Sequence, residues 1–291
     1  MQRSLGIVTY EKFPELTDDD RPLIDEFARV GFRAAPVMWM DHRVRWSDYD
    51  ALLLRSCWDY HLRPAEFTKW LQHIEHAGVP VWNPYVVVRW NLHKRYLRQL
   101  ASRGAHIPQT VWVNRGSQQP LSEIVRTSGW EQAMVKPAIS ASAMDTWRVG
   151  SDGADDARFA ELTNRDDVLV QEFIPEVGTQ GEWSLVFIDG DFSHAIIKRP
   201  RPGEFLVQSE HGGSAEPAQP STETLAAGTA IADGIPAGWI YARVDGVVTP
   251  RGFVLMEVEC IEPHLFFGYN PDARRRLATA LTRLIGQGRV R

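Results

Sequence analysis

Apolar and polar positions along the first 84 residues follow a pattern in which short apolar runs alternate with amphipathic stretches. The apolar runs predict strands, and apolar residues spaced three or four apart predict helices. Strands are expected at 5–10, 32–39, 51–57 and 79–83, and helices at 64–77 and from Thr17, or a neighbouring aspartate, to Val30. Such alternation is typical of an α/β unit with a mainly parallel sheet. Residues 1–84 are therefore predicted to form an N-terminal α/β lobe.

The rest of the chain is predicted to form a connecting segment (85–113), a small central lobe (114–174) and a C-terminal lobe (175–291). The connecting segment is expected to hold one long helix over 86–103 and a strand over 107–113. In the central lobe we expect helices near 119–129 and 155–164, and strands that end at Pro137, Val149 and Ile174. In the C-terminal lobe we expect antiparallel runs at 182–188, 191–198 and 204–208, a helix near 220–233, a hairpin and a terminal helix. The predicted fold class is α/β (α+β), with an antiparallel sheet in the C-terminal lobe.

The predicted hairpin carries acidic side chains among apolar neighbours. Successive side chains of a strand point to opposite faces, so Glu257 and Glu259 share one face and Asp245 lies on one face with Arg243. Adjacent carboxylates on an apolar strand are costly unless a positive charge lies between them. Oxygen donors suit a hard cation such as Mg²⁺. The pattern favours a metal site at Asp245, Glu257 and Glu259 over a solvated charged strand face.

The register of this hairpin follows from its predicted loop. The residues Pro250-Arg251-Gly252 fit a three-residue loop in which the glycine supplies a positive φ. Thr249 is then expected to pair with Phe253, which places Asp245 opposite Glu257 and Arg243 opposite Glu259. In this register Phe253 and Leu255 share the face of the two glutamates.

Composition and charge narrow the class of protein. The chain has 291 residues, of which 44% are hydrophobic and 24% charged, as in a folded protein. A formal net charge of −5 and the absence of a basic run argue against nucleic-acid binding. Cys57 and Cys260 lie too far apart in sequence to indicate a disulfide framework or a zinc site. The N-terminus is not expected to be a signal peptide, and no stretch is apolar enough for a membrane span, so a cytoplasmic protein is expected.

Basic and small residues indicate a phosphate site of an uncommon kind. Neither the dinucleotide-binding glycine pattern nor the P-loop pattern occurs. Instead Lys136 ends a strand before Pro137, and the small residues Ser140-Ala141-Ser142 follow. Backbone amides of such a loop can lie close over phosphates. Together with Lys94 and Lys198, these residues are suited to neutralise a triphosphate, although a single lysine is more often a surface residue.

The strand that ends in Gln171-Glu172-Phe173-Ile174 leaves the central lobe at Pro175. A connecting segment in this position can offer its backbone to the edge of an adenine ring, with an acidic side chain near the ribose. Glu176 and Glu182 both follow closely, and the sequence leaves open which of them that would be.

The order of these motifs resembles that of the ATP-grasp superfamily, which includes glutathione synthetase and D-alanine–D-alanine ligase. The resemblance covers essentially the whole chain and implies ATP held between two antiparallel sheets. It implies that Lys94 and Lys136 contact phosphates under a mobile loop at Ser140–Ser142. The adenine site is implied at Gln171, Glu172, Phe173 and Ile174, and Mg²⁺, as two ions, at the three acids of the hairpin. Many members have an asparagine where this chain has Glu259, which makes this metal site more acidic.

Within the superfamily, several segments look like the group that contains the cycloserine-forming enzyme. These segments are Arg55–Tyr60, Arg201–Gln208, His211–Gly213 and Glu257–Pro263. The resemblance implies a ligase that converts a carboxylate to an acyl phosphate for attack by a nitrogen nucleophile, with ring closure in one molecule as a specific form. Dipeptide or amide ligation between two molecules, and a nucleotide-binding sensor without turnover, are the alternatives.

Candidate residues for the chemistry follow from these roles. Arg243, or a backbone amide of His211–Gly213, is expected to stabilise the developing oxyanion, and Lys198 to spread phosphate charge. Arg55 and Arg201 are candidates for binding the substrate carboxylate, and Asp59 for binding an ammonium group. The full substrate set is Arg55, Ser56, Asp59, Tyr60, Arg201, His211, Gly212 and Gly213. A surface Arg–Asp pair, a solvated Arg201 and plain loop flexibility are the simpler explanations. The expected partner is a small amino-acid-like molecule. A homodimer is suggested by the resemblance alone, since many relatives of this fold are dimers and no residue pattern in this chain indicates one.

Overall fold

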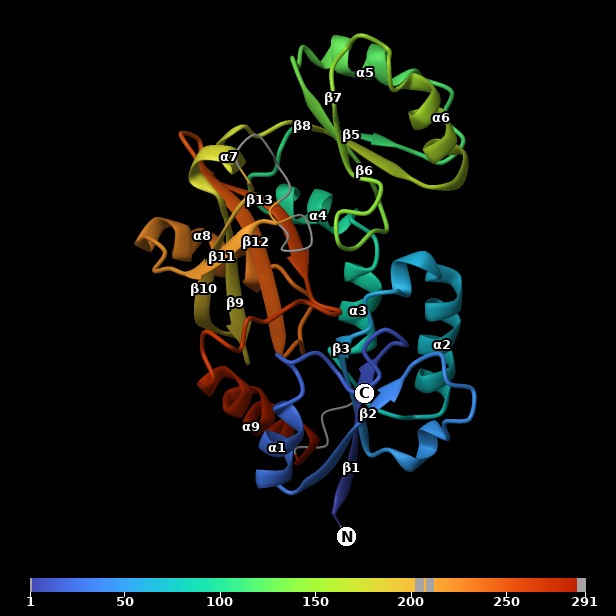
Figure 1. The fold of residues 1–291 in the computed structure, drawn as a ribbon, viewed down its shortest axis with the longest axis vertical. Coiled ribbons are helices and arrows are strands. Elements are labelled where there is room, and N and C mark those ends of the chain that lie inside the picture. The colour runs from blue at the N-terminus through green and yellow to red at the C-terminus, as the bar shows by residue number, and fades with distance from the viewer. Residues whose placement is uncertain (1, 202–206, 208–211, 287–291) are drawn as a thin grey trace.

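The computed structural model describes residues 2–201, Val207 and residues 212–286. Figure 1 shows three units, each built on a sheet of its own, with the central unit lying farthest from the N-terminus. The predicted α/β class is confirmed by parallel and antiparallel sheets within the described residues.

The N-terminal unit contains a parallel sheet with the strand order β2-β1-β3-β4. Its strands and helices match the elements predicted from the sequence: β1 (Arg3–Thr9), α1 (Leu23–Arg29), β2 (Phe32–Met38), β3 (Ala51–Ser56), α2 (Pro64–His76) and β4 (Val81–Trp82). Helix α1 begins later than expected because residues 17–21 form turns instead, in which Asp20 and Arg21 both donate their amides to the carbonyl of Thr17. These turns form part of a long loop between β1 and α1.

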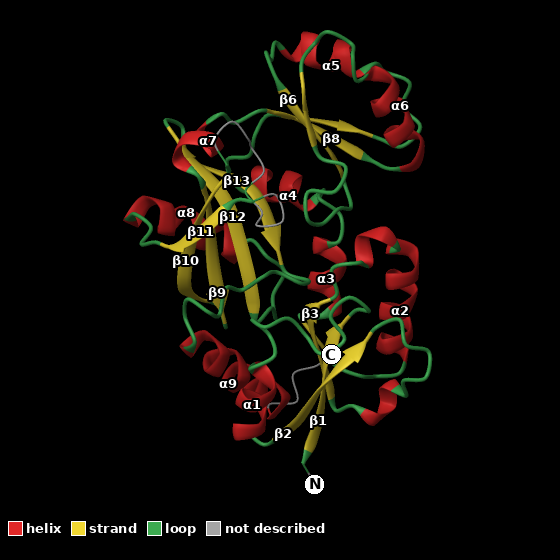
Figure 2. Ribbon diagram, viewed as in Figure 1, coloured by secondary structure: helices red, strands yellow, loops and turns green. Residues whose placement is uncertain are grey.

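The central unit contains an antiparallel sheet with the order β5-β8-β6-β7. Its elements are β5 (Thr110–Val113), α5 (Leu121–Ser128), β6 (Ala133–Pro137), β7 (Trp147–Val149), α6 (Asp156–Arg165) and β8 (Val168–Glu172). Helices α5 and α6 cover one face of this sheet, as Figure 2 shows. Because β5 pairs with β8, this sheet includes a strand that the sequence pattern assigned to the connecting segment. We therefore propose a central lobe that begins near residue 108.

The third unit contains a larger antiparallel sheet with the order β11-β10-β9-β12-β13. Its elements are α7 (Glu176–Gln180), β9 (Glu182–Ile188), β10 (Asp191–Arg199), β11 (Ser214–Pro217), α8 (Thr222–Asp233), β12 (Tyr241–Thr249), β13 (Gly252–Glu259) and α9 (Asp272–Gly286). The run expected at 204–208 lies outside the described residues except for Val207. None of the helices in the described ranges is long and apolar enough to cross a membrane.

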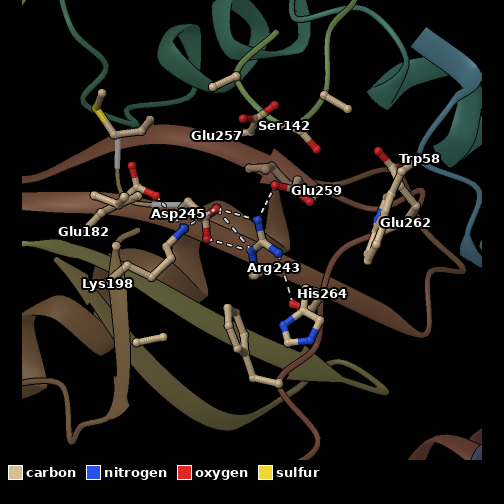
Figure 3. A pocket seen from close by; sticks show the side chains of 18 of the residues that line it. Trp58, Ser142, Glu182, Lys198, Arg243, Asp245, Glu257, Glu259, Glu262 and His264 are labelled. Carbon is tan, nitrogen blue, oxygen red and sulfur yellow. Dashed lines mark hydrogen bonds and ion pairs between the residues drawn. The ribbon is translucent and has the colours of Figure 1, made fainter. Parts of the chain in front are cut away.

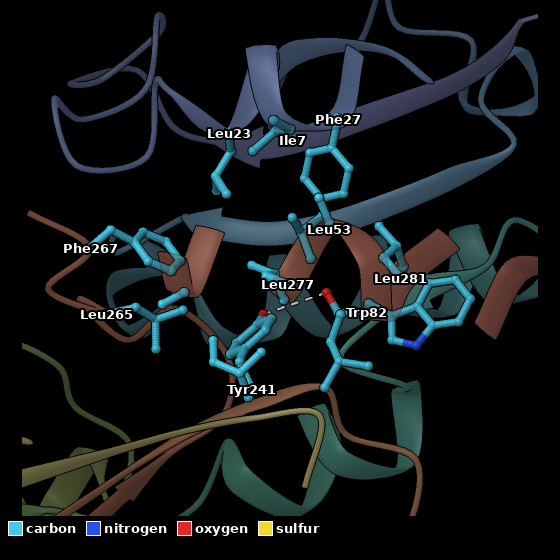
Figure 4. Packing of buried hydrophobic residues seen from close by; sticks show 14 of the residues in the cluster. Ile7, Leu23, Phe27, Leu53, Trp82, Tyr241, Leu265, Phe267, Leu277 and Leu281 are labelled. Carbon is cyan, nitrogen blue, oxygen red and sulfur yellow. Dashed lines mark hydrogen bonds between the residues drawn. The ribbon is translucent and has the colours of Figure 1, made fainter. Parts of the chain in front are cut away.

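One apolar core joins the N-terminal unit to the third unit. Phe27 of α1, Leu277 and Leu281 of α9 and Tyr241 of β12 belong to it, together with residues of β1 and β3. Figure 4 shows these side chains meeting between the N-terminal sheet and α9. The hydroxyl of Tyr241 donates to the carbonyl of Leu54 at 2.7 Å, so the start of β12 is tied to the end of β3.

The prediction of one long helix over 86–103 is wrong. The chain forms two helices there, α3 (Tyr85–Asn91) and α4 (Tyr96–Ser102), with a break between them. At the break the amide of Lys94 donates to the carbonyl of Ala138, in the central unit, at 2.8 Å. This bond replaces the bond to the carbonyl four residues earlier that would continue the helix. The break is therefore a contact between units, and it carries Lys94.

In the β12–β13 hairpin, the residues next to the loop pair differently from the prediction, whereas Asp245 and Arg243 have the predicted partners. The loop has two residues, Pro250 and Arg251, so that Thr249 pairs with Gly252. The register then shifts between Asp245 and Gly246, which restores the predicted pairs of Asp245 with Glu257 and Arg243 with Glu259.

The extra residue of this bulge is Met256, and it changes which side chains share a face. Phe253, Leu255 and Val258 pack into the core on the α8 side of the sheet. Met256, Glu257 and Glu259 line a cavity on the other side. The prediction that Phe253 and Leu255 share the face of the glutamates is wrong, because one inserted residue reverses the alternation.

Strand β13 lies at the edge of the sheet as described, and side chains satisfy its outer backbone groups. The Asn91 amide nitrogen donates to the carbonyl of Val258 at 2.7 Å, and its oxygen accepts from the amide of Cys260 at 2.7 Å. The hydroxyl of Tyr96 accepts from the amide of Val258 at 3.1 Å. Asn91 thus takes the place of a neighbouring strand on both sides of Glu259.

We expect Asn91→Leu to lower the free energy of unfolding by roughly 3 kcal/mol, because two buried backbone groups lose their partners. The measurement is urea unfolding followed by circular dichroism. Asn164→Leu, at an exposed position of α6, is the control and should change stability by less than about 0.5 kcal/mol. Equal effects of the two substitutions would contradict the structural role given to Asn91.

Candidate active site

A cavity of about 1000 Å³ lies where the three units meet. Its wall combines the cavity face of β12 and β13, the ends of β6 and β10, the break between α3 and α4, and the loops after β1 and β3. Figure 3 shows basic and acidic side chains converging at its middle. A large cavity with converging charged groups is the expected location of an active site.

A buried pair of charges from β12 forms the floor of the cavity. Arg243 donates through Nε to Asp245 Oδ1 at 3.0 Å and through Nη2 to Asp245 Oδ2 at 2.9 Å. Lys198 contacts the same carboxylate at 3.2 Å, and Ser184 donates to it at 2.7 Å. Burial alone would raise the pKa of Asp245, but the two cations hold this pKa at about 2. Asp245 is therefore ionised and fully engaged by its neighbours.

Glu257 and Glu259 project from β13 above this pair. Lys94 contacts Glu257 at 2.5 Å, and Arg243 contacts Glu259. The side chains remain 34% and 25% exposed, so some of their oxygens are accessible from the cavity. Burial raises the pKa of Glu259 to about 7, and the charges of Asp245 and Glu257 add to the effect. The two glutamates therefore favour an additional cation.

The acids do not form the closed cluster that the sequence suggested. In the part of the chain that the structure describes, no three acidic, histidine or cysteine side chains are arranged to hold a metal ion. The oxygens of Asp245 are taken by Arg243, Lys198 and Ser184. The accessible oxygens of Glu257 and Glu259 nevertheless fit Mg²⁺, which is commonly bound by one or two carboxylates together with phosphates.

Three lysines approach the same region from different elements. Lys198 contacts Glu182 at 2.6 Å besides Asp245, and Lys94 also donates to the carbonyl of Ser140 at 3.1 Å. Lys136 forms no ion pair within the described ranges. Its pKa is lowered to about 8, chiefly by burial and further by Lys94. Lys136 is therefore a cation without an ion-pair partner among the described residues. An anionic group of a molecule bound in the cavity would provide that partner.

The loop after β6 has an unusual backbone. Ser142, Ala143 and Asp145 have φ values of 52°, 56° and 51°, in the left-handed region that residues other than glycine rarely adopt. Ser140, Ala141 and Ser142 line the cavity, as predicted for a loop close to a ligand. Such strain persists only where the surroundings impose it, and it is common at ligand-binding sites.

The far end of the cavity, beside the connection out of the central unit, is apolar. Phe173, Ile174 and Met256 line it. The side chains of Gln171 and Glu172, predicted for the same wall, turn elsewhere: Gln171 donates to Thr110 at 2.9 Å, and Glu172 pairs with Arg251 at 3.2 Å.

The structure also distinguishes the two acids that follow this connection. Glu182 lines the cavity and pairs with Lys198. Glu176 is half-buried at the start of α7 and does not line the cavity. The geometry therefore favours Glu182 as the acid next to a bound ligand.

Most residues predicted to bind the carboxylate and the ammonium group lie outside the cavity wall. Arg55 is 1% exposed and bonds Asp20 at 2.9 Å and the carbonyl of Pro263 at 2.8 Å. Ser56 donates to the same Asp20 at 2.8 Å. Asp59 accepts from the indole of Trp39 at 2.8 Å. These side chains are taken by buried structural contacts, so the expectation that they contact substrate is corrected.

The loop of Arg201 and the glycines gives a mixed outcome. Arg201 is exposed, donates to the carbonyl of Gly212 at 3.3 Å and does not line the cavity. Gly213 lines the cavity, whereas Gly212 does not. His211 lies outside the described residues.

Several residues of the cavity wall were not among the predicted site residues, including Asp19, Trp58, Glu262 and His264, whereas the predicted Tyr60 does line the cavity. The ring of His264 lies on the cavity wall, with its Nε2 3.4 Å from Asp19. A signal for Glu262 was present, since it follows Glu259 within the same acidic segment.

Comparisons with known proteins show which proteins this chain is similar to. A family model described as "D-cycloserine synthetase DcsG, N-terminal domain" matches residues 5–83. The cycloserine biosynthesis protein DcsG of Streptomyces lavendulae is 29% identical over 291 residues, covering 95% of this chain and 97% of that protein. The crystal structure of D-cycloserine synthetase DcsG superposes with a TM-score of 0.85 at 26% identity, covering 97% of this chain and 99% of that one.

A second solved structure has the same architecture. D-Alanine–D-alanine ligase from Bacillus anthracis, solved in complex with ATP, superposes with a TM-score of 0.70. It is 17% identical and covers 99% of this chain and 98% of that one, a likeness that shows the fold.

The fold and these matches define an ATP-grasp ligase, and the family predicted from the sequence is confirmed. The chain is closely similar to ATP-grasp ligases, enzymes that join a carboxylate to an amine at the expense of ATP, over nearly its whole length. Within this superfamily it is similar over nearly its whole length to D-cycloserine synthetase.

The lowered pKa of Lys136 predicts a pH-dependent penalty on stability. Because the pKa of Lys136 is about 8, below the 10.5 usual for a lysine, folding disfavours the charged form of this side chain. The penalty is complete below pH 8 and fades as the pH rises toward 10.5. Lys136→Met should therefore raise the free energy of unfolding at pH 7 by roughly 1–2 kcal/mol, and by less at pH 9.5.

The measurement is urea unfolding of the ligand-free protein at both pH values. Lys69→Met, at an exposed position of α2, is the matched control and should show no such dependence on pH. A stability gain from Lys136→Met that is the same at both pH values would be the contrary result.

Proposed function

We propose that this enzyme uses ATP and Mg²⁺ to convert the carboxylate of a small amino-acid-like substrate to an acyl phosphate, which a nitrogen of the same molecule then attacks to close a ring. The observation that carries the proposal is the arrangement in one cavity of Lys94, Lys136, Lys198 and Arg243 around Glu257 and Glu259. A carboxylate needs such activation because its oxygen is a poor leaving group, and phosphoryl transfer depends on positioning and charge neutralisation.

The nucleotide is proposed to enter with its base at the apolar end. Phe173, Ile174 and Met256 offer apolar contact to an adenine ring, and the backbone between Gln171 and Ile174 offers hydrogen bonds to its edge. Glu182 is the acid placed to accept from the ribose hydroxyls. The phosphates would then extend toward the middle of the cavity.

Lys136 and Lys94 are proposed to hold the phosphates together with the loop at Ser140–Ser142. Lys136 has a free ammonium group, whereas Lys94 exchanges part of its contact with Glu257 for phosphate. The left-handed backbone of Ser142 and Ala143 turns successive amides in a way that suits an anion. The same loop would close over the phosphates when they bind.

Glu257 and Glu259 are proposed to hold Mg²⁺, as two ions, with Asp245 completing the acidic surroundings. Bound there, Mg²⁺ would neutralise the phosphates and orient them for transfer. Asp245 contributes mainly by fixing Arg243 and Lys198, since its oxygens are occupied.

Arg243 is proposed to stabilise the oxyanion that develops when nitrogen attacks the acyl phosphate. Its guanidinium is fixed by Asp245 and by the carbonyl of His264 at 3.0 Å. A donor held rigidly before the reaction begins requires no reorganisation during it, which is the source of its catalytic effect. Lys198, held by Glu182 and Asp245, would spread charge on the transferred phosphoryl group.

Ring closure is favoured because the similarity to D-cycloserine synthetase extends over nearly the whole of both chains. We further propose a cytoplasmic enzyme, since the reaction consumes ATP. Homodimer formation stays a prediction from the sequence.

The reaction itself is tested by Mg²⁺-dependent ADP release across a panel of amino acids and O-substituted serines, with mass spectrometry of each product. The expected result is a product mass equal to one substrate minus water, because the carboxylate oxygen leaves with the phosphate when the ring closes. A product mass equal to two substrates minus water would indicate intermolecular ligation instead. ATP binding without substrate-dependent ADP release would indicate a nucleotide sensor.

Glu257→Gln should lower substrate-dependent ADP release by at least about 100-fold while the protein remains folded, because the metal loses a charged ligand. Glu161→Gln, on the exposed face of α6, is the matched control and should leave the rate unchanged. A Glu257→Gln enzyme with the wild-type rate at every Mg²⁺ concentration would refute the metal assignment.

A further inference from the structure

The end of the cavity beyond Glu259 has a chemistry of its own. Glu262, Trp58 and Tyr60 line it, and His264 lies nearby. Figure 3 shows Glu262 beside Trp58, away from the cluster of Lys198 and Asp245. The indole nitrogen of Trp58 donates to the backbone carbonyl of Glu262 at 2.7 Å, which fixes the two residues relative to each other.

Glu262 is a buried acid without a positively charged partner. The residue is 5% exposed and yet lines the cavity. It forms no ion pair with any side chain that the structure describes, unlike Asp245, Glu257 and Glu259. Its carboxyl group has a hydrogen bond from Tyr60, which carries no charge.

Keeping the Glu262 carboxyl group ionised costs free energy because it is buried and has no cation beside it. A positively charged ligand would lower this cost. Burial raises the pKa of Glu262 well above its usual range, and the negative charges of Glu259 and Glu257 raise it further. A positive group on a bound molecule would offset both effects. Lys94 is committed to Glu257 and to the carbonyl of Ser140.

Aromatic rings beside the carboxyl group add a second preference for a cation. Tyr60 is 6% exposed, and Trp58 is held by an edge-to-face contact with Phe13 at 5.5 Å between ring centroids. The face of an aromatic ring attracts an ammonium group, most strongly where water is excluded. An acid flanked by Trp and Tyr is therefore suited to a small primary ammonium.

We propose that Glu262, with Trp58 and Tyr60, binds the α-ammonium group of the amino-acid substrate. The inference rests on the proposed ligase function and deepens it, because it assigns to Glu262, Trp58 and Tyr60 the discrimination between an ammonium group and a hydroxyl group on the substrate. Glu262 follows the proposed metal ligand Glu259 by three residues. An α-amino acid can therefore place its ammonium on Glu262 and direct its carboxylate toward Arg243 and the phosphates.

The test is calorimetric titration of the full-length protein loaded with ADP and Mg²⁺. The probes are alanine against lactate and serine against glycerate, each in both enantiomers, because each pair differs only in an ammonium or hydroxyl group. The wild-type protein should bind at least one amino acid on the order of 30-fold more tightly than its hydroxy counterpart. In Glu262→Gln this preference should fall to about threefold or less, with the affinity for ADP unchanged. Glu161→Gln should keep the wild-type preference.

Two outcomes would overturn the inference: a Glu262→Gln protein with the wild-type preference, or a wild-type protein that binds no amino acid more tightly than its hydroxy counterpart at millimolar concentrations. Should Glu262→Gln fail to fold, Trp58→Leu provides the same test and should lower the preference several-fold. The binding assay does not depend on turnover. A protein that prefers the amino acid and yet releases no ADP would refute the ligase function while supporting the ammonium site.

Discussion

The bulge at Met256 is the constraint on which the site depends. Next to the two-residue loop of the β12–β13 hairpin, Thr249 pairs with Gly252. Beyond the bulge the register is shifted by one residue, and Asp245 pairs with Glu257. Without the extra residue, Glu257 and Glu259 would point into the core on the α8 side, where Leu255 and Val258 pack. With it, both carboxylates point into the cavity opposite Arg243 and Asp245. Asn91 and Tyr96 then hold the outer edge of the same stretch, so that the glutamates stay in place.

Charge compensation explains why so many ionised groups remain buried in the ligand-free protein. Asp245 is neutralised by Arg243 and Lys198, and Glu257 by Lys94. The compensation is incomplete at Lys136, which lacks an anion, and at Glu262, which lacks a cation. On the proposed path, Lys136 lies where the phosphates are expected and Glu262 lies where an ammonium group is expected. The uncompensated groups thus describe a ligand that is anionic in the middle of the cavity and cationic at one end.

Much of this architecture could be predicted from the sequence, because periodicity and motif order are local properties. Most strands of the three units, the pairing of Asp245 with Glu257 and the position of Lys136 near a strand end were predicted correctly, whereas β11 was not predicted. Contacts between distant segments were not. The break before Lys94 arises from a bond to Ala138 in another unit, and periodicity over 86–103 contains no trace of it.

The residues proposed to bind substrate were predicted less well than the strands, because their roles also depend on contacts between distant segments. Arg55 has the residue type and position of a carboxylate ligand, but Asp20 and Pro263 already occupy it. Only the folded chain shows that these partners are close. Glu262 was overlooked for the opposite reason, since its importance comes from the absence of a partner, which no pattern of residues reveals. The bulge at Met256 could not be predicted from the sequence either. Until the pairing of β12 with β13 is known, one inserted residue cannot be distinguished from a longer hairpin loop.

The most direct test of the account is a crystal structure with Mg²⁺ and a non-hydrolysable ATP analogue. The account predicts a triphosphate between Lys136 and the hairpin, with Mg²⁺ about 2.1 Å from oxygens of Glu257 and Glu259. The adenine ring would lie against Phe173 and Met256. A nucleotide bound with its phosphates away from the two glutamates, or a metal ion held elsewhere, would contradict the central claim that the bulged hairpin is the metal-nucleotide site.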